Sequence, residues 1–205
     1  MISKDNNLIL FLKYPEKGRV KTRLAKDIGN EKALLIYKKL VSKILNQINS
    51  NNYNISIYYF PENKKNEVKK WINLPDIKYL PQSGDDLGAR MLNAFKDSIS
   101  LKYTKTVIIG TDCLEINDNI ISKSFYLLDD SNLVLGPATD GGYYLIGLKA
   151  VVETIFQDIH WSTEKVLKQT INKAKEIKLS YKFLDFLSDI DTLEDLNNYK
   201  YLINQ

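Results

Sequence analysis

Two aspartates each follow an apolar segment, in a pattern that suits ligand binding or catalysis. Asp112 ends the stretch Thr106 to Asp112, and Asp140 ends a similar stretch that begins at Leu133. Runs of β-branched and aliphatic residues are typical of buried parallel strands, and open α/β sheets bind ligands at the carboxyl ends of their strands. One such aspartate is more often a turn or helix-capping residue, but two neighbouring examples favour an active site. We therefore predict a site with Asp112 at its centre and Asp140 as a second catalytic residue.

A basic loop, Tyr14 to Leu24, follows the first apolar run and precedes a helical pattern. Cations and free backbone amides in this position suit phosphate groups. The loop lacks the Gly-Lys-Ser/Thr ending of a Walker loop and has no Gly-x-Gly-x-x-Gly. We interpret its Lys17 and Arg19 as solvent-exposed charges. Lys21 and Arg23 would point the same way in an extended segment, so we predict that they bind phosphate.

A second polar loop, Gln82 to Gly88, opens a predicted helix that has Arg90 near its start. A cation there faces the positive end of the helix dipole and needs an anion nearby. A surface ion pair with Asp86, worth about 0.2–0.5 kcal/mol, and a bound substrate are equally good explanations. Asp85 is either a ligand-binding residue or the helix N-cap. The two loops together give the predicted nucleotide- and phosphate-binding residues: Lys13, Lys21, Thr22, Arg23, Asp85 and Arg90.

The acidic residues also suggest a divalent metal ion. In nucleotide enzymes Mg²⁺ or Mn²⁺ takes one or two carboxylates together with phosphate oxygens and waters. Asp112 supplies one carboxylate, and Asp189 or Asp191 could supply another, although Asp191 stands beside a predicted helix cap formed by Thr192 and Asp195. We therefore predict Mg²⁺ or Mn²⁺ as the cofactor, with Asp112, Asp189 and Asp191 as candidate ligands.

Glycines after Asp140 and a later tryptophan complete the candidate site. Gly141 and Gly142 let the backbone come very close to another group, and a bound sugar or phosphate is a plausible one. With Trp161, they form the predicted set for the acceptor or sugar. The single histidine excludes a Ser-His-Asp triad and a histidine-rich metal site. Cys113 is not predicted to be a nucleophile, because the adjacent Asp112 would raise the pKa of its thiol.

Composition limits the class of protein. The 205 residues carry a net charge of +4, with 44% hydrophobic residues and one cysteine. This charge is too mild and too evenly spread to argue for nucleic acid. No apolar run approaches the roughly 18 residues of a membrane span, and we expect no signal peptide. One cysteine rules out internal disulfides and fits a cytoplasmic protein.

The segments that must position these residues alternate between strand and helix patterns, which predicts an α/β fold with a largely parallel sheet. One or two strands near the end are expected to be antiparallel because of the tight Gly141-Gly142 turn. We see no linker or repeat and predict one domain over residues 1–205. The predicted strands are Leu8 to Lys13, Tyr53 to Phe60, Ile77 to Leu80, Thr106 to Ile109, Leu133 to Gly136, Tyr143 to Leu148 and Ile177 to Leu184. The predicted helices are Glu31 to Ile48, Glu62 to Asn73, one from Leu87, Asp118 to Leu128, one from Val166 and one after Thr192, with a polar turn at Asn49 to Asn52.

These motifs, taken in order, resemble a DUF2064-type bacterial glycosyltransferase-like family, some members of which are labelled arsenosugar biosynthesis glycosyltransferases. The resemblance is carried by Gly18-Arg19-Val20-Lys21-Thr22-Arg23-Leu24, Gly84-Asp85-Asp86-Leu87-Gly88-Ala89-Arg90, Ile109-Gly110-Thr111-Asp112-Cys113, Gly136-Pro137-Ala138-Thr139-Asp140-Gly141-Gly142-Tyr143, Trp161-Ser162-Thr163 and Asp189-Ile190-Asp191-Thr192. It implies the GT-A nucleotide-diphospho-sugar transferase fold, a three-layer α/β/α sandwich around a mixed, mostly parallel sheet. In that fold an Asp-x-Asp commonly ends the central strand, whereas this chain has only Asp112 there, followed by Leu114-Glu115.

The leading hypothesis is a metal-dependent glycosyltransferase that takes its sugar from a nucleotide-diphosphate donor and passes it to a small-molecule acceptor. A nucleotidyltransferase that releases pyrophosphate from a nucleoside triphosphate is the alternative. A catalytically silent nucleotide-sugar-binding protein is a third possibility. Donor base, sugar, acceptor and oligomeric state have no readable pattern in the sequence.

Overall fold

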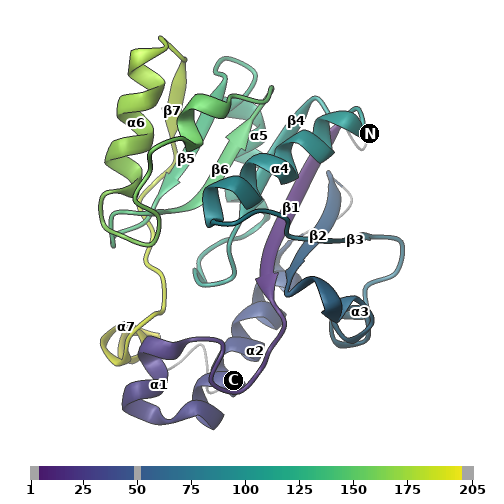
Figure 1. Ribbon diagram of the computed structural model, residues 1–205, viewed down its shortest axis with the longest axis vertical. Helices are drawn as coiled ribbons and strands as arrows, with labels where there is room; N and C mark the ends of the chain where they lie inside the picture. The colour runs from purple at the N-terminus through teal and green to yellow at the C-terminus, as the bar shows by residue number, and fades with distance from the viewer. Residues whose placement is uncertain (1–4, 49–51, 200–205) are drawn as a thin grey trace.

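The computed structural model describes residues 5–48 and 52–199, and within them all the named strands belong to one sheet (Figure 1). Its seven strands lie in the order β3-β2-β1-β4-β6-β5-β7. β6 is antiparallel to both of its neighbours, and the other pairs are parallel, which confirms the predicted mixed sheet. The strands are β1 (Asn6–Lys13), β2 (Asn54–Phe60), β3 (Lys78–Pro81), β4 (Lys105–Ile109), β5 (Leu133–Pro137), β6 (Tyr143–Leu148) and β7 (Tyr181–Phe183).

Helices cover both faces of this sheet, as alternation along β1 requires. Leu8, Leu10 and Leu12 pack with residues of α2, α3 and α5, whereas Ile9 and Phe11 pack with α4, α6 and a 3₁₀ segment. The predicted three-layer α/β/α sandwich is therefore confirmed. The helices are α1 (Thr22–Ile28), α2 (Asn30–Gln47), α3 (Lys65–Ile72), α4 (Leu87–Ser100), α5 (Asp118–Leu127), α6 (Val166–Glu176) and α7 (Leu193–Asn198), with 3₁₀ segments η1 (Glu62–Lys64) and η2 (Glu153–Phe156).

The sheet reverses its order of growth between β1 and β4. From β1 the chain builds β2 and β3 outward on one side, and it then returns to place β4 on the other side of β1. Ligands of open α/β sheets bind beside such a switch point, outside the carboxyl ends of the strands. Lys13 ends β1, and Asp112 follows β4 by three residues. Lys13 and Asp112, both predicted site residues, thus lie at the edge of the sheet that suits ligand binding.

Two sequence predictions need correction. α1 is missing from the prediction, in which the first loop extends to Leu24 and the first helix begins at Glu31. Its seven residues bury only Leu24 and show no repeating apolar face. Gly29, at φ 83°, separates it from α2. The last strand is shorter than predicted and covers only Tyr181–Phe183, since a turn with Lys178 at φ 54° follows α6. Residues 49–51 of the predicted polar turn lie outside the described residues.

α1 and α7 lie side by side at one end of the molecule, away from most of the sheet (Figure 1). Leu24 of α1, Ile36 and Leu40 of α2, and Ile190 and Leu196 form a small separate core there. The predicted cap of α7 is confirmed, because the Thr192 and Asp195 side chains each bond the other's backbone N–H. This small core brings the segment 189–191 against the first loop.

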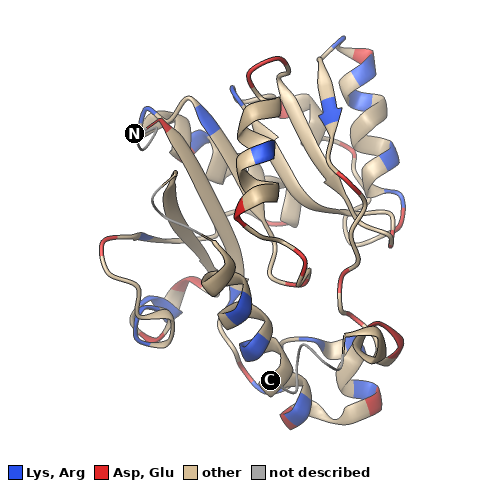
Figure 2. Cartoon of the chain, turned by 180° about the vertical axis from the view of Figure 1, so that it is seen from behind, with Lys and Arg blue, Asp and Glu red and all other residues tan. Residues whose placement is uncertain are grey.

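Basic and acidic residues are scattered mainly over the helices and loops, whereas most of each strand is neither (Figure 2). Within residues 5–48 and 52–199, no helix is both long and apolar enough to cross a bilayer.

Candidate functional site

A cavity of about 1100 Å³ opens at the carboxyl ends of β1 and β4. Its size is slightly above the usual range for small-molecule sites. It is lined by every predicted site residue except Gly141: Lys13, Lys21, Thr22, Arg23, Asp85, Arg90, Asp112, Asp140, Gly142, Trp161, Asp189 and Asp191. Segments far apart in the sequence thus meet in one place.

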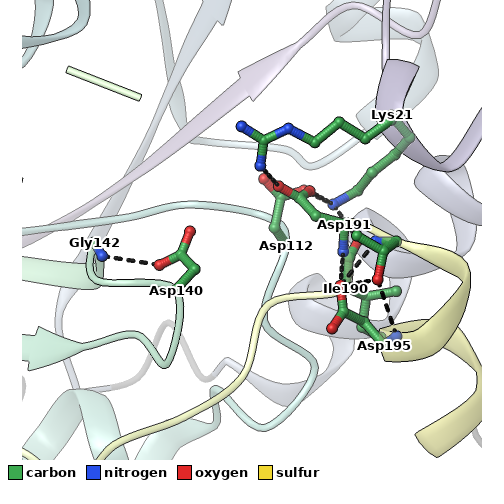
Figure 3. Close-up of polar contacts among 9 residues, drawn as sticks. Lys21, Asp112, Asp140, Gly142, Ile190, Asp191 and Asp195 are labelled. Atoms are coloured by element: carbon green, nitrogen blue, oxygen red, sulfur yellow. Dashed lines mark hydrogen bonds and ion pairs between the residues drawn. The ribbon is translucent and has the colours of Figure 1, made fainter. Parts of the chain in front are cut away.

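The wall formed by the first loop is built around the ammonium group of Lys21. Its Nζ lies 2.5 Å from Asp112 Oδ1 and 2.9 Å from Asp191 Oδ1, and it donates to the carbonyl oxygen of Ile190 at 2.6 Å (Figure 3). The side chain is only 3% exposed. Burial by itself would lower the pKa of Lys21, but the charges of Asp112 and Asp191 outweigh it and raise that pKa. Lys21 is therefore a fully charged ammonium at neutral pH.

Lys21 and Arg23 point toward the same place, as predicted, but not because the segment is extended. The segment is not extended: Lys21 has left-handed backbone angles, φ 49° and ψ 45°, and α1 begins at the next residue. Non-glycine residues with this geometry are uncommon and concentrate at functional sites. Both side chains still reach Asp191, where Arg23 Nη1 lies 3.5 Å from Oδ2, and Arg23 stays 62% exposed. Arg23 is the cation of this wall that remains accessible to a ligand.

Lys17, interpreted from sequence as a solvent-exposed charge, bonds Glu31 at 2.5 Å and does not line the cavity. Glu115, which follows Cys113 closely, is also outside the cavity, and it accepts a hydrogen bond from the hydroxyl of Tyr199. Burial raises the pKa of the Cys113 thiol to about 12, which disfavours a thiolate; the main cause is burial and not the adjacent Asp112 expected from the sequence.

The structure does not bear out two of the explanations offered for the second loop. Asp86, not Asp85, caps α4, since its Oδ1 accepts from the Ala89 N–H at 2.7 Å. Arg90 forms no ion pair with Asp86 among the described residues. Its Nε donates to the carbonyl oxygen of Gly84 at 3.0 Å, and its guanidinium carbon lies 4.3 Å from the centroid of the Phe60 ring. These contacts hold Arg90 in place and leave its other donors for a ligand.

Asp140 lies apart from the Lys21 cluster (Figure 3). Its Oδ1 accepts from the Gly142 N–H at 2.8 Å, so it does stabilise its own turn, while its exposed carboxylate also lines the cavity. Gly141, which was expected to approach a ligand, does not line the cavity. A Cβ at Gly141 would lie 2.2 Å from the carbonyl oxygen of Glu164, so this glycine admits the protein's own backbone. Trp161 similarly packs against Gly88.

Sequence reasoning missed two residues that fix the floor of the cavity. Gln82 Nε2 donates to the carbonyl oxygens of Leu12 and Tyr58, at 3.1 and 2.9 Å. The Tyr37 hydroxyl accepts from the Lys13 N–H and donates to the Lys13 carbonyl oxygen, each at 2.8 Å. Both line the cavity. No local pattern reveals them, because their partners are 24 to 70 residues away.

Asp189 is half-buried beside the other acidic residues. Burial raises its pKa to about 7, and the nearby charges of Asp112 and Asp140 add to the rise. The folded protein thus keeps a proton on Asp189 that the unfolded chain loses near pH 4. The stabilisation from this proton is complete below about pH 4, and it disappears as the pH rises to about 7.

The change in the free energy of unfolding caused by Asp189→Asn should therefore be more favourable at pH 8, where the unaltered protein has lost the proton, than at pH 5. We expect a difference of about 1–2 kcal/mol, since solvent screens a partly buried carboxylate. Urea denaturation of both proteins at the two pH values, with EDTA present, measures it. Asp130→Asn, at an exposed ion pair with Lys182, is the control and should show no such change. If Asp189→Asn changes the free energy of unfolding equally at pH 5 and pH 8, the pKa of Asp189 is not raised in the folded protein.

Comparisons with known proteins agree with this geometry. Residues 44–163 match a protein family described as "Uncharacterized protein conserved in bacteria (DUF2064)". None of the curated proteins matches the sequence. The crystal structure of a proposed nucleotide-diphospho-sugar transferase from Desulfovibrio desulfuricans is 28% identical, with a TM-score of 0.88 over 98% of both chains.

Two more distant structures share the fold. A 4-diphosphocytidyl-2C-methyl-D-erythritol synthase from Anaerococcus prevotii has a TM-score of 0.63 at 9% identity, over 98% of this chain and 97% of that one. An inositol-1-phosphate CTP transferase from T. maritima has a TM-score of 0.54 at 15% identity, over 98% and 96%. Nucleotide-diphospho-sugar transferases and cytidylyltransferases are thus the proteins that this fold resembles.

Proposed function

Because the chain belongs to this DUF2064 family and has a nucleotide-diphospho-sugar transferase fold, we propose that it is a metal-dependent transferase. It takes a sugar from a nucleotide-diphosphate donor and passes it to a small-molecule acceptor. The cavity at the β1–β4 switch point is the observation that carries the proposal, because it gathers accessible arginines and several carboxylates in one place.

The charges of the cavity support a requirement for a divalent cation. Among the described residues, seven acidic and five basic ones line it. Even when Asp189 keeps its proton, the other six carboxylates outnumber the five cations, so the lining repels a diphosphate unless further positive charge enters with it. The acidic residues are Asp85, Asp86, Asp112, Asp140, Glu164, Asp189 and Asp191, and the basic ones are Lys13, Lys21, Arg23, Arg90 and Lys165.

The donor set fits a cation that takes part of its coordination from phosphate. No three acidic, histidine or cysteine side chains in the described part of the chain converge into a complete metal cage. Asp112 and Asp191 do converge, because both contact the Lys21 ammonium, and Mg²⁺ needs only one or two carboxylates beside phosphate oxygens and waters. Asp112 and Asp191 would hold the ion, with Asp189 nearby. When bound, it would supply positive charge to the leaving diphosphate.

The remaining roles follow from position. Arg23 and Arg90 bind the diphosphate, since both line the cavity and retain free guanidinium donors. Asp140 holds or deprotonates the acceptor hydroxyl, with its carboxylate oriented by the Gly142 N–H. Trp161 offers its indole, packed on Gly88, as a surface for the sugar or acceptor.

One observation favours nucleotidyl transfer as a second candidate. In nucleotidyltransferases of this fold an Asp-x-Asp-Thr-like segment can supply a second metal-binding carboxylate, and Asp189-Ile190-Asp191-Thr192 is such a segment. Lys21 brings Asp191 beside Asp112, and the Ile190 N–H donates to the Asp112 carbonyl oxygen at 2.9 Å. Pyrophosphate release from a nucleoside triphosphate and a sugar phosphate distinguishes this activity from sugar transfer.

Thermal denaturation against a panel of nucleotides tests the proposal first. We expect one nucleoside diphosphate sugar, together with Mn²⁺ or Mg²⁺, to raise the melting temperature by several degrees. A ligand at 100 times its dissociation constant adds about 2.7 kcal/mol of stability. The nucleoside monophosphate and the free sugar are the controls.

The outcomes of the panel separate the candidates. A shift with triphosphates only, accompanied by pyrophosphate release, would replace sugar transfer with nucleotidyl transfer. A melting-temperature shift that does not depend on metal, together with the absence of turnover with any acceptor, would identify a silent binding protein. No shift with any nucleotide would overturn the proposed nucleotide site.

A further inference from the structure

The Lys21 ammonium has no donor left for a ligand. An ammonium group has three N–H bonds, and Lys21 has three acceptors within 2.9 Å: Asp112 Oδ1, Asp191 Oδ1 and the Ile190 carbonyl oxygen. The side chains of Asp112 and Asp191 are 43% and 37% exposed, whereas that of Lys21 is 3% exposed. The two carboxylates are thus open to the cavity, whereas the cation that they share is almost fully buried against them. As it stands, Lys21 cannot bind phosphate as the sequence alone predicts.

Lys21 also occupies the place at which the two carboxylates converge. A divalent cation held between Asp112 and Asp191 would lie close to the Lys21 ammonium, which already engages Oδ1 of each carboxylate and is only 3% exposed. Repulsion between like charges is strong where water is largely excluded from one of them. Lys21 and a divalent cation therefore oppose each other's binding to this carboxylate pair.

We propose that Lys21 and a divalent cation compete for the Asp112–Asp191 carboxylate pair, so that the cation binds tightly only together with a diphosphate that accepts the Lys21 ammonium. Lys21 exchanges carboxylate oxygens for phosphate oxygens, and the carboxylates become free for the cation. The diphosphate in this inference rests on the proposed function, but the competition itself does not.

The balance of positive and negative charges in the cavity supports this exchange. If Lys21 left its carboxylates without a replacement cation, Asp112 would lose its ion-pair partner and Asp191 would keep, among the described residues, only Arg23, at 3.5 Å. If the cation entered without the diphosphate, Lys21 would lose both carboxylates and keep only the Ile190 carbonyl oxygen of its three acceptors. Each displacement is unfavourable alone, and the two together leave every charge paired. Binding of metal and diphosphate is thus expected to be cooperative.

The test measures Mn²⁺ binding to the protein by electron paramagnetic resonance, without any nucleotide present. Lys21→Met removes the ammonium while keeping the apolar stem, so we expect its dissociation constant for Mn²⁺ to fall at least about tenfold, a typical coupling between sites. Lys17→Met is the matched control, because Lys17 is in the same loop but is paired with Glu31 outside the cavity. Adding Asp112→Asn to Lys21→Met should abolish the gain. Equal Mn²⁺ affinity of Lys21→Met and the unaltered protein would overturn the proposal.

A measurement on the unaltered protein applies if Lys21→Met does not fold. Acetylation of lysines, read by mass spectrometry, should be slow at Lys21 and should accelerate at Mn²⁺ concentrations that stabilise the protein, while Lys17 stays unchanged. If Lys21 stays protected at those concentrations, metal and ammonium coexist and the proposal is wrong. Neither experiment uses a sugar donor or acceptor. Absence of sugar transfer would therefore leave the competition intact, and a failed competition would leave the transferase proposal standing.

Discussion

Replacing Asp112 with asparagine is expected to lower the turnover of the nucleotide-diphosphate sugar by at least about 100-fold, the loss typical of removing one electrostatic group from a transition state. Asparagine keeps the size of the side chain but removes its charge. The variant should still fold, because Lys21 keeps Asp191 and the Ile190 carbonyl oxygen as partners. Initial rates with the donor identified by thermal denaturation, measured at saturating Mn²⁺ beside a melting curve, provide the data.

The control for this prediction is Asp130→Asn, which removes a carboxylate outside the cavity and should leave turnover unchanged. Asp140→Asn should also lower turnover, but its effect should depend on the acceptor, because Asp140 lies apart from the Lys21 cluster (Figure 3). If Asp112→Asn is folded and turns over the donor at an unaltered rate, Asp112 is not at the reaction centre. The assignment of the whole site would then be wrong.

Replacing Gly141 with alanine is expected to give the largest loss of stability among the glycines near the site. The residue has φ 87°, and a Cβ there would lie 2.2 Å from the carbonyl oxygen of Glu164. A strained backbone costs about 1–3 kcal/mol, and forced overlap in a packed region adds about 1–3 kcal/mol. Because the Gly141 carbonyl oxygen also accepts from the Leu167 N–H, the change should disturb the start of α6 and the cavity wall near Trp161.

Two other glycines separate the causes of that loss. Gly29, at φ 83°, has no atom within 4 Å of its Cβ position, so Gly29→Ala reports the backbone cost alone. Gly142 has no positive φ and would meet only Asp140 Oδ1, at 3.1 Å, so Gly142→Ala should cost least. Free energies of unfolding from urea denaturation should rank the losses as Gly141, then Gly29, then Gly142. A loss at Gly141 no larger than at Gly29 would show that the segment at Glu164 moves aside freely.

The fold was predictable because its signals are local. The apolar runs at Leu8, Thr106 and Leu133 give buried strands, and the one-sided pattern of α2 gives a helix. Capping chemistry located the start of α7 within the same few residues. α1 escaped prediction because it is short and buries a single residue, so its formation depends on packing with α2 and α7 and not on its own sequence.

The membership of the candidate site was also largely predictable from strand ends, because parallel strands bring their carboxyl ends to one edge of a sheet. The partners of each residue were not. Gly141 needs to be glycine because of Glu164, which lies more than twenty residues away, and Arg90 of α4 rests on Phe60 at the end of β2. Contacts between distant segments have no periodicity or spacing that a sequence can display.

The sequence by itself determined the α/β class, the strand ends that carry Asp112 and Asp140, and the cations of the first loop. Only the tertiary structure decided what those cations do. Lys21 was expected to present a free ammonium to phosphate, yet it is buried and shared by Asp112 and Asp191, which are 91 and 170 residues away along the chain. A buried charge takes the acceptors that folding brings to it, and those acceptors are set by packing at a distance. The charge state and partners of the site are therefore properties of the folded chain.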